Sequence, residues 1–226
     1  MTMTSISTTS FKFLKELTAN NNRDWFQANK DRYQVAQTEA KAFLEEVEKA
    51  LNKFDQIEKK KLFRIYRDVR FSKDKTPYNT ALRMSLGRDG HYRRGGYYIQ
   101  IGPGVTKVGG GFYNPNPADL KRIRDNIALD ATPLRKILKS KAFKSNFGEL
   151  LGEQLKTSPK GYDKEHPDID LLRYKSMYVF RSFTDKDAKG QDMVKDIAKT
   201  YKAIRPFFDY MTEILTHDLD GVPLYG

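Results

Sequence analysis

The sequence predicts an α+β fold: a central antiparallel sheet (a meander) flanked by N-terminal and C-terminal helices. Strand-like segments gather in the middle of the chain, helical patterns occupy both ends, and the two kinds do not alternate as in βαβ units. A chain of 226 residues is long enough to bury a core without disulfides. We expect residues 1–9 to be a disordered tail and residues 10–226 to form a single α+β domain.

The N-terminal segments show helical periodicity. In residues 11–17 apolar side chains recur every three residues, which predicts a short helix. A long helix is expected from about Arg23 to Lys53, because an apolar stripe runs through it and Asn22 precedes it as a capping residue.

Residues 62–71 fit two patterns. As a strand they would place four apolar side chains on the face that carries Arg67, and as a helix they would form an apolar stripe. The Ile, Tyr, Val and Phe in this segment favour a short strand that enters a loop at Asp68.

Three further segments, 81–87, 96–102 and 105–113, predict the antiparallel meander. The connection RDGHYRRG between the first two contains Asp-Gly, which is typical of a hairpin. Glycines 109–111 indicate a bulge or a close approach to the backbone, and a phosphate cradle made by their amides is the less favoured alternative.

The C-terminal half predicts mostly helices. Asn116 is the expected N-cap of the first of them, because Pro117 follows it at the first helical position. The predicted elements are a helix at 114–127, a helix capped by Thr132, a short helix at 168–174, a strand at 175–183, and helices at 189–202 and 205–216 separated at Pro206.

The composition and motifs exclude several classes of protein. There are no cysteines, so disulfides and thiolate chemistry are excluded, and a cytoplasmic location is expected. No apolar run is long enough to cross a membrane. The chain has neither a P-loop nor a G-x-S-x-G elbow. Its three histidines, His91, His166 and His217, lie far apart, so we expect no metal site and no cofactor.

The positive charge is concentrated in one stretch. The net charge is +12, and residues 59–94 carry twelve Lys or Arg against three acids. A local excess of this kind suggests an anionic partner. The alternative is a basic face that is simply solvated.

Within this stretch, residues 64–78 read RIYRDVRFSKDKTPY. Arginine presents a planar set of donors and keeps its charge near neutrality, so several arginines around one point form a receptor for phosphate or carboxylate. Asp68 is expected to pair with Arg67 or Arg70 and to hold a guanidinium in place. The candidate ligand-binding residues are Arg64, Arg67, Arg70, Lys75 and Tyr78.

This pattern resembles RxxRDxRFxxxKxPY, the signature of a conserved domain-of-unknown-function family of bacteria with longer relatives in fungi. The resemblance extends from FLKEL and NNRDWF, through GGGFYNP, to PKGYDKEHPDIDLLRYKS, which is nearly the whole chain. It implies no activity, substrate or cofactor. It adds a second candidate part of the site, formed by His166, Asp168, Arg173 and Lys175.

Arg173 and Lys175 end a helix and enter a strand, from which they could face the 64–78 loop across the sheet. Ordinary capping with solvated ends is the alternative. If the protein is an enzyme, which the residues leave open, Asp68 or His166 is the candidate general base.

Three hypotheses of function follow. The favoured one is a protein that binds a small anionic ligand, carrying phosphate or carboxylate, in an Arg/Lys-rich pocket. The second is nucleic-acid binding by the basic strip 59–94, and the third is a purely structural Arg/Asp cluster. The second would use Lys59–Lys61, Arg93–Arg94 and exposed Tyr92, Tyr97 and Tyr98. The sequence predicts no oligomeric state.

Overall fold

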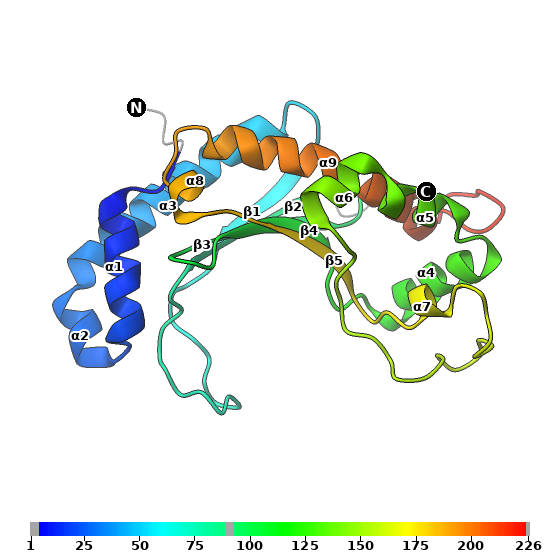
Figure 1. Cartoon of the computed structure of the whole chain (residues 1–226), viewed down its shortest axis with the longest axis horizontal. Helices are drawn as coiled ribbons and strands as arrows, with labels where there is room; N and C mark the ends of the chain where they lie inside the picture. The colour runs from blue at the N-terminus through cyan, green and yellow to red at the C-terminus, as the bar shows by residue number, and fades with distance from the viewer. Residues whose placement is uncertain (1–4, 89–92, 225–226) are drawn as a thin grey trace. The chain divides into compact units, whose positions relative to one another are not determined.

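A computed structural model of the chain describes residues 5–88 and 93–224 (Figure 1). The chain forms two compact units. The first contains the chain up to Leu86 together with Tyr98–Val108 and Ser182–Lys199, and the second contains Gly87–Tyr97, Gly109–Arg181 and the chain from Thr200 onward. That residues 10–226 act as one domain stays a prediction.

The described residues contain one five-stranded antiparallel sheet with the order β1-β2-β3-β4-β5. Each strand pairs with its neighbour in sequence, which is the predicted meander, and the α+β fold is confirmed. The strands are β1 (Ile57–Leu62), β2 (Leu82–Arg88), β3 (Gly96–Ile101), β4 (Lys107–Phe112) and β5 (Met177–Ser182). The predicted turn between β2 and β3 falls largely on residues 89–92, outside the described residues.

Side chains alternate between the two faces of the central strands. Leu82, Met84 and Leu86 of β2 are buried, whereas Arg83 between them is exposed. In β3 the buried residues alternate in the same way, and Tyr98 lies on the face opposite to them. The non-core face of these strands therefore carries Arg83 and Tyr98.

Glycines 109–111 lie within β4, where neighbouring backbone comes close. A Cβ atom on Gly109 would lie 1.8 Å from the carbonyl oxygen of Val179, and one on Gly110 would lie 2.3 Å from that of Gly96. The expected close approach to the backbone is thus confirmed, and the atoms that approach are the carbonyls of β5 and β3.

The predicted short strand that enters a loop at Asp68 does not form as a regular strand. β1 ends at Leu62, and the residues after it enter a long connection to β2, in which Tyr66 pairs with Tyr78 as an isolated antiparallel bridge. The residues of this segment have a high β-propensity, but that propensity depends on packing one face of the strand. Phe63, Tyr66 and Phe71 are exposed, so this packing is largely missing. The lysine-rich residues before this segment form the edge strand instead, a position that tolerates lysine.

The N-terminal helices are α1 (Thr8–Ala19), α2 (Arg23–Ala28) and α3 (Lys30–Leu51), and Asn22 caps α2 as predicted. The prediction of a single helix over 23–53 is wrong, because the helix is interrupted at Asn29, between α2 and α3. The Asn29 side chain donates to the carbonyl of Trp25 at 2.9 Å, which competes with regular helix hydrogen bonding. α1 begins inside the expected tail, and Ile6 before it is fully buried.

Later helices are α4 (Pro117–Leu129), α5 (Thr132–Lys139), α6 (Lys141–Phe147), α7 (Ile169–Leu172), α8 (Asp185–Ala188) and α9 (Met193–Thr216). Asn116 caps α4 as predicted, accepting from the Asp119 N–H. Thr132 is not a cap but the first residue of α5, and its N–H donates to Asp130 instead. Helices α6 and α8 were not predicted.

The predicted break at Pro206 is also wrong, since Pro206 lies inside the continuous helix α9. An internal proline costs a helix about 3 kcal/mol. Ile204, Phe207 and Phe208 beside it are fully buried, and each buried side chain of this kind contributes about 1.5–3 kcal/mol. Packing therefore outweighs the lost hydrogen bond.

Across residues 5–88 and 93–224, no helix is both long and apolar enough to cross a bilayer. The same residues contain no group of three or more His, Asp or Glu placed to hold a metal ion.

Candidate functional site

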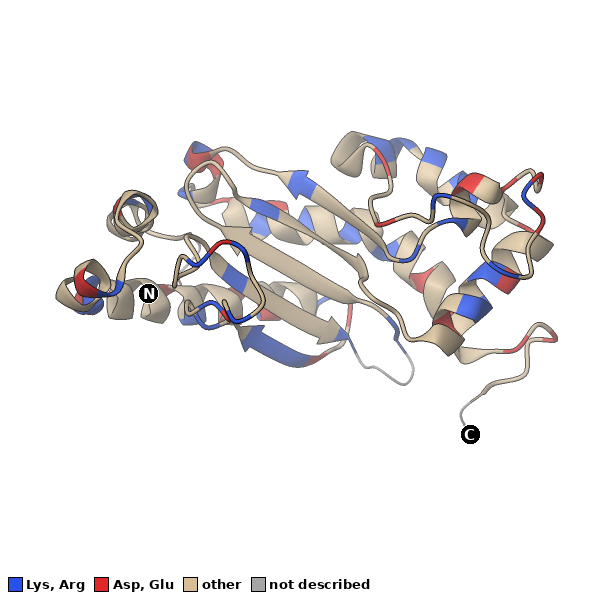
Figure 2. Ribbon diagram, turned by 90° about the horizontal axis from the view of Figure 1, so that it is seen from below, with Lys and Arg blue, Asp and Glu red and all other residues tan. Residues whose placement is uncertain are grey.

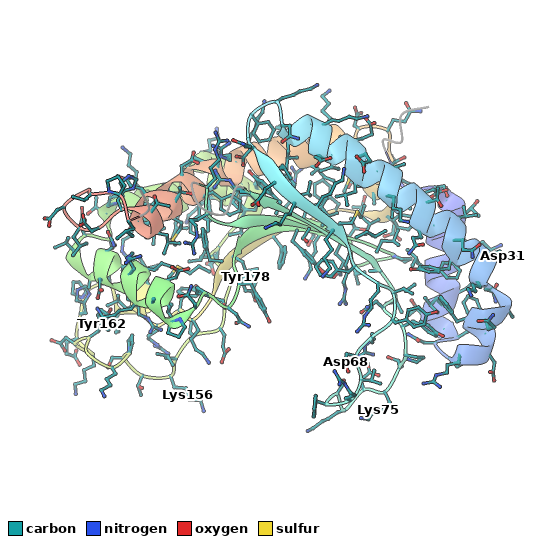
Figure 3. The ribbon with its side chains drawn as sticks, turned by 180° about the vertical axis from the view of Figure 1, so that it is seen from behind. Asp31, Asp68, Lys75, Lys156, Tyr162 and Tyr178 are labelled. Atoms are coloured by element: carbon teal, nitrogen blue, oxygen red, sulfur yellow. The ribbon has the colours of Figure 1, made fainter. Side chains whose placement is uncertain are left out.

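The connection from β1 to β2 continues their pairing beyond the ends of both strands. The Phe63 N–H donates to the Arg83 carbonyl at 2.9 Å, the Asn79 N–H to Ile65 at 2.7 Å, and the Arg67 N–H to Pro77 at 2.8 Å. We call residues 64–78 the basic loop. Its base is therefore an extension of the sheet, and Figure 3 shows its labelled residues Asp68 and Lys75 side by side, away from the helices of the first unit.

The turn between α1 and α2 holds the end of the basic loop. The Asn21 amide donates to the Tyr78 carbonyl at 2.9 Å and accepts from the Tyr78 N–H at 3.1 Å. The Tyr78 ring is buried and stacks on Phe26, with ring centroids 4.0 Å apart and planes inclined by 16°. Tyr78 is thus used by the fold, as an anchor between α2 and the loop.

Arg67 is fixed by the far side of the loop. Its Nη1 donates to Asp74 Oδ2 at 2.5 Å, to the Thr76 carbonyl at 3.1 Å and to the Thr76 hydroxyl. Asp74 also accepts from the N–H of Thr76 at 2.9 Å. All these contacts use Nη1, so Nε and Nη2 of Arg67 have no partner in the part of the chain that the structure describes.

Asp74→Asn is expected to lower the free energy of unfolding at neutral pH but not in strong acid. Hydrogen bonds from Thr76, and then from Arg67, lower the pKa of Asp74 from 3.8 to about 2. A carboxylate whose pKa falls on folding stabilises the folded chain above its unfolded pKa, and this contribution is lost as the pH falls toward the folded pKa.

Urea unfolding of both proteins at neutral pH and near pH 2 would check this prediction, since the wild-type advantage should shrink between about pH 4 and about pH 2. An advantage of equal size at both pH values would show that the Asp74 charge does not stabilise the loop.

Asp68 pairs with Arg70, one of its two expected partners. Arg70 Nε lies 3.0 Å from Asp68 Oδ1, and Nη2 lies 2.7 Å from Oδ2. The side chain of Arg70 lowers the pKa of Asp68, so this carboxylate is a weaker base than usual. Lys75 Nζ donates to the carbonyls of Val69 at 2.9 Å and Arg70 at 3.4 Å. Arg70 and Lys75 thus hold the loop's own shape.

A hollow of about 390 Å³ opens beside the base of the basic loop. It is lined by Phe63, Arg64, Tyr66, Arg67, Asp68, Asn79, Arg83 and Tyr98. Within residues 5–88 and 93–224, the guanidinium groups of Arg64 and Arg83 donate no hydrogen bond. The hollow therefore combines these two guanidinium groups with the oriented guanidinium of Arg67. After the hydrogen bonds from Arg70, the charge of Arg64 also helps to lower the pKa of the Asp68 carboxylate.

The hollow only partly matches the predicted site. Arg64, Arg67 and Asp68 line it, whereas Arg70, Lys75 and Tyr78 do not. Sequence reasoning missed Asn79, Arg83 and Tyr98. For Arg83 a signal existed, because it is the one charged residue in the strand-like segment 81–87, where alternation places it on the non-core face.

The second predicted group lies in the second unit and is occupied by local contacts. Arg173 Nε donates to the Leu155 carbonyl at 2.7 Å, and Lys175 pairs with Glu153. His166 Nδ1 accepts from the Asp168 N–H at 3.1 Å, which leaves the proton on Nε2, facing the Ala128 carbonyl at 3.2 Å. That these residues face the basic loop, and that His166 or Asp68 acts as a base, stays a prediction.

Asp168 and Asp170 are both bound by one arginine. Arg135 Nε lies 2.5 Å from Asp168 Oδ1, and its Nη2 lies 2.6 Å from Asp170 Oδ1. A guanidinium held by two carboxylates makes the start of α7 a structural ion cluster.

Several cations of the basic strip are paired with acids. Figure 2 shows where Lys and Arg (blue) and Asp and Glu (red) lie along the ribbon. Lys60 pairs with Glu45 and Glu48 of α3, and Arg94 pairs with Asp119. Tyr97, which was expected to be exposed, is 1% exposed. Its ring packs against Tyr201 and Phe208, with centroids 4.4 and 5.1 Å away. Tyr98 is half-buried, and Tyr92 lies outside the described residues.

One family model matches residues 9–210, and its description is Conserved hypothetical protein (DUF2461). The match covers most of the chain and confirms the resemblance to a family of unknown function. That RxxRDxRFxxxKxPY is the signature of this family stays a prediction. No curated protein and no solved structure matches the chain.

Proposed function

The chain belongs to this conserved hypothetical family, and we propose that it binds a small anion, a phosphate or carboxylate group, in the hollow beside the basic loop. The observation that carries the proposal is that one hollow contains the guanidinium groups of Arg64 and Arg83, which donate no hydrogen bond within the described residues. A guanidinium stays charged near neutrality and binds such groups through paired hydrogen bonds.

Arg67 adds a third charge in a fixed orientation. Asp74 and Thr76 hold its Nη1, so its remaining N–H groups are ordered before a ligand arrives. Ordering a donor in advance removes part of the entropy cost of binding. Arg67 therefore contributes to anion binding without the entropy cost of ordering its own side chain.

The acid in the hollow does not cancel this attraction. Both carboxylate oxygens of Asp68 accept hydrogen bonds from Arg70, which offsets their charge. A volume of about 390 Å³ falls within the usual range for small-molecule sites, about 300–1,000 Å³. The hollow thus has room for an anionic group together with a small remainder of a ligand.

The double variant Arg64→Gln/Arg83→Gln is expected to lose anion binding. Each charge-assisted hydrogen bond contributes about 1.5–3 kcal/mol, so loss of one at each arginine lowers affinity by about a hundredfold or more. Thermal unfolding with inorganic phosphate, pyrophosphate, citrate and sugar phosphates would measure it. An anion at a hundred times its Kd adds about 2.7 kcal/mol, which raises the Tm by roughly 5–10 °C.

Arg122→Gln is the matched control. It removes one arginine charge from α4 of the second unit, at a residue that does not line the hollow. The proposal predicts that this control keeps the ligand-induced Tm shift. An equal shift in the double variant and the wild type would place any bound anion elsewhere.

A further inference from the structure

Phe71 is displayed to solvent at the tip of the basic loop. Its side chain is 97% exposed, whereas most phenylalanines of the chain are buried. A phenyl ring left in water forgoes about 1.5–3 kcal/mol of burial. A single exposed ring is common on protein surfaces, and what distinguishes Phe71 is the ordered turn that holds the ring together with the cations around it.

The exposure of Phe71 results from ordered structure around it. The Ser72 N–H donates to the Val69 carbonyl at 3.3 Å, which closes a turn with Arg70 and Phe71 at its centre. Lys75 Nζ also donates to that same Val69 carbonyl, at 2.9 Å. The turn therefore holds the Phe71 ring in its exposed position before any partner binds.

The charges around the ring are predominantly positive. Residues 64–75 contain five Lys or Arg and two acids. The Arg70 guanidinium carbon lies over the Phe71 ring, 5.9 Å from its centroid, so a positive charge lies next to the ring. A flat ring beside fixed cations is the combination that binds bases and phosphates of an unpaired strand.

We propose that the basic loop binds single-stranded nucleic acid, with one base stacked on Phe71 and a backbone phosphate in the hollow with Arg64 and Arg83. The inference rests on the proposed function, because it identifies the anion of the hollow as a phosphodiester. A base stacks on an aromatic side chain whatever its identity, so we expect little preference for sequence.

An anionic membrane surface fits the tip less well. One phenyl group gives weak insertion, since even a single myristoyl chain anchors a protein only marginally. A lipid surface also offers no flat base that could stack on the ring. An unpaired strand supplies both a base for the ring and phosphates for the cations.

The test is fluorescence anisotropy with labelled 12-nucleotide dT and U strands at low and moderate salt. Phe71→Ala is expected to weaken binding about tenfold, the order of one lost stacking contact, and Arg64→Gln/Arg83→Gln to weaken it further. Tyr113→Ala removes another exposed ring, 75% exposed and in the second unit, and should bind like the wild type.

Phe71→Trp supplies a direct signal. The chain has a single tryptophan, Trp25, which stacks on Phe13. The variant should bind the strands at least as tightly as the wild type, and the added emission should be quenched when a base stacks on it. The emission of the wild type gives the background from Trp25.

Strand binding that is equally tight in Phe71→Ala, or no binding of either strand, would overturn the inference. Binding of phosphatidylserine vesicles through Phe71 without binding of the strands would also overturn it. Pyrophosphate separates the two proposals. If pyrophosphate binds through Arg64 and Arg83 and the strands do not bind, only this inference fails. If none of inorganic phosphate, pyrophosphate, citrate and the sugar phosphates binds, the hollow and this inference fail together.

Discussion

Gly109→Ala is expected to destabilise the protein by about 3–5 kcal/mol, at the upper end of single substitutions. The added Cβ would lie 1.8 Å from the Val179 carbonyl oxygen and 2.8 Å from a ring carbon of Phe180. A backbone oxygen inside a strand pair cannot turn aside as a side chain can. The substitution therefore forces β4 and β5 apart and weakens their hydrogen bonds.

Gly148→Ala separates this effect from the general cost of replacing glycine. Gly148 lies in the same unit with φ +70°, and nothing lies within 4 Å of its would-be Cβ. Its replacement should cost only the strain of its backbone conformation, about 1–3 kcal/mol, because φ +70° with ψ −86° disfavours an L side chain. Urea unfolding followed by circular dichroism would compare the two. If both variants lose the same stability, the close approach of β5 to β4 does not constrain position 109.

Phe26→Ala is expected to cost about 3–5 kcal/mol, as for other fully buried phenylalanines. Phe26 is 1% exposed and stacks on Tyr78 at 4.0 Å, and its ring also approaches Phe13, Tyr33 and Tyr66. Its loss opens a cavity in the aromatic cluster of the first unit. The cavity lies directly beneath the anchor of the basic loop.

Phe71→Ala makes the same chemical change on the surface and provides the comparison. At 97% exposure it should alter the free energy of unfolding by no more than about 0.5 kcal/mol. Chemical denaturation of both variants and the wild type would check this. A loss in Phe26→Ala as small as that in Phe71→Ala would mean that the cluster relaxes to fill the space.

Features decided within a few residues could be predicted from the sequence. Asn22 and Asn116 cap their helices because a short side chain reaches the free N–H groups of the next turn. Strands β2 and β3 of the meander were predictable because their side chains alternate between apolar and polar along the sequence.

Features decided by distant packing could not be predicted in the same way. The continuity of α9 through Pro206 depends on the burial of neighbours such as Phe207 and Phe208, which the local sequence does not reveal. β1 has the composition of a surface segment, and only its position beside β2 makes it a strand.

The candidate site likewise has a part that could be predicted from the sequence and a part that could not. The cluster of arginines was visible, but which of them are already bound was not. Arg67 is held by Asp74 and Arg70 by Asp68, whereas Arg83, a strand residue outside the motif, joins Arg64 in the hollow. Contacts between side chains distribute these roles, and no spacing rule encodes them.

The lysines of β1 have a consequence for how the protein behaves in concentrated solution. β1 is an outer strand of the sheet, and an outer strand offers unpaired N–H and C=O groups to any other chain. Lys59 and Lys61 are exposed there, while Lys60 is bound to α3. A second copy aligning along β1 would set like charges against each other. The sheet therefore resists growing from molecule to molecule at this edge, so the same residues that make the strip basic also limit aggregation.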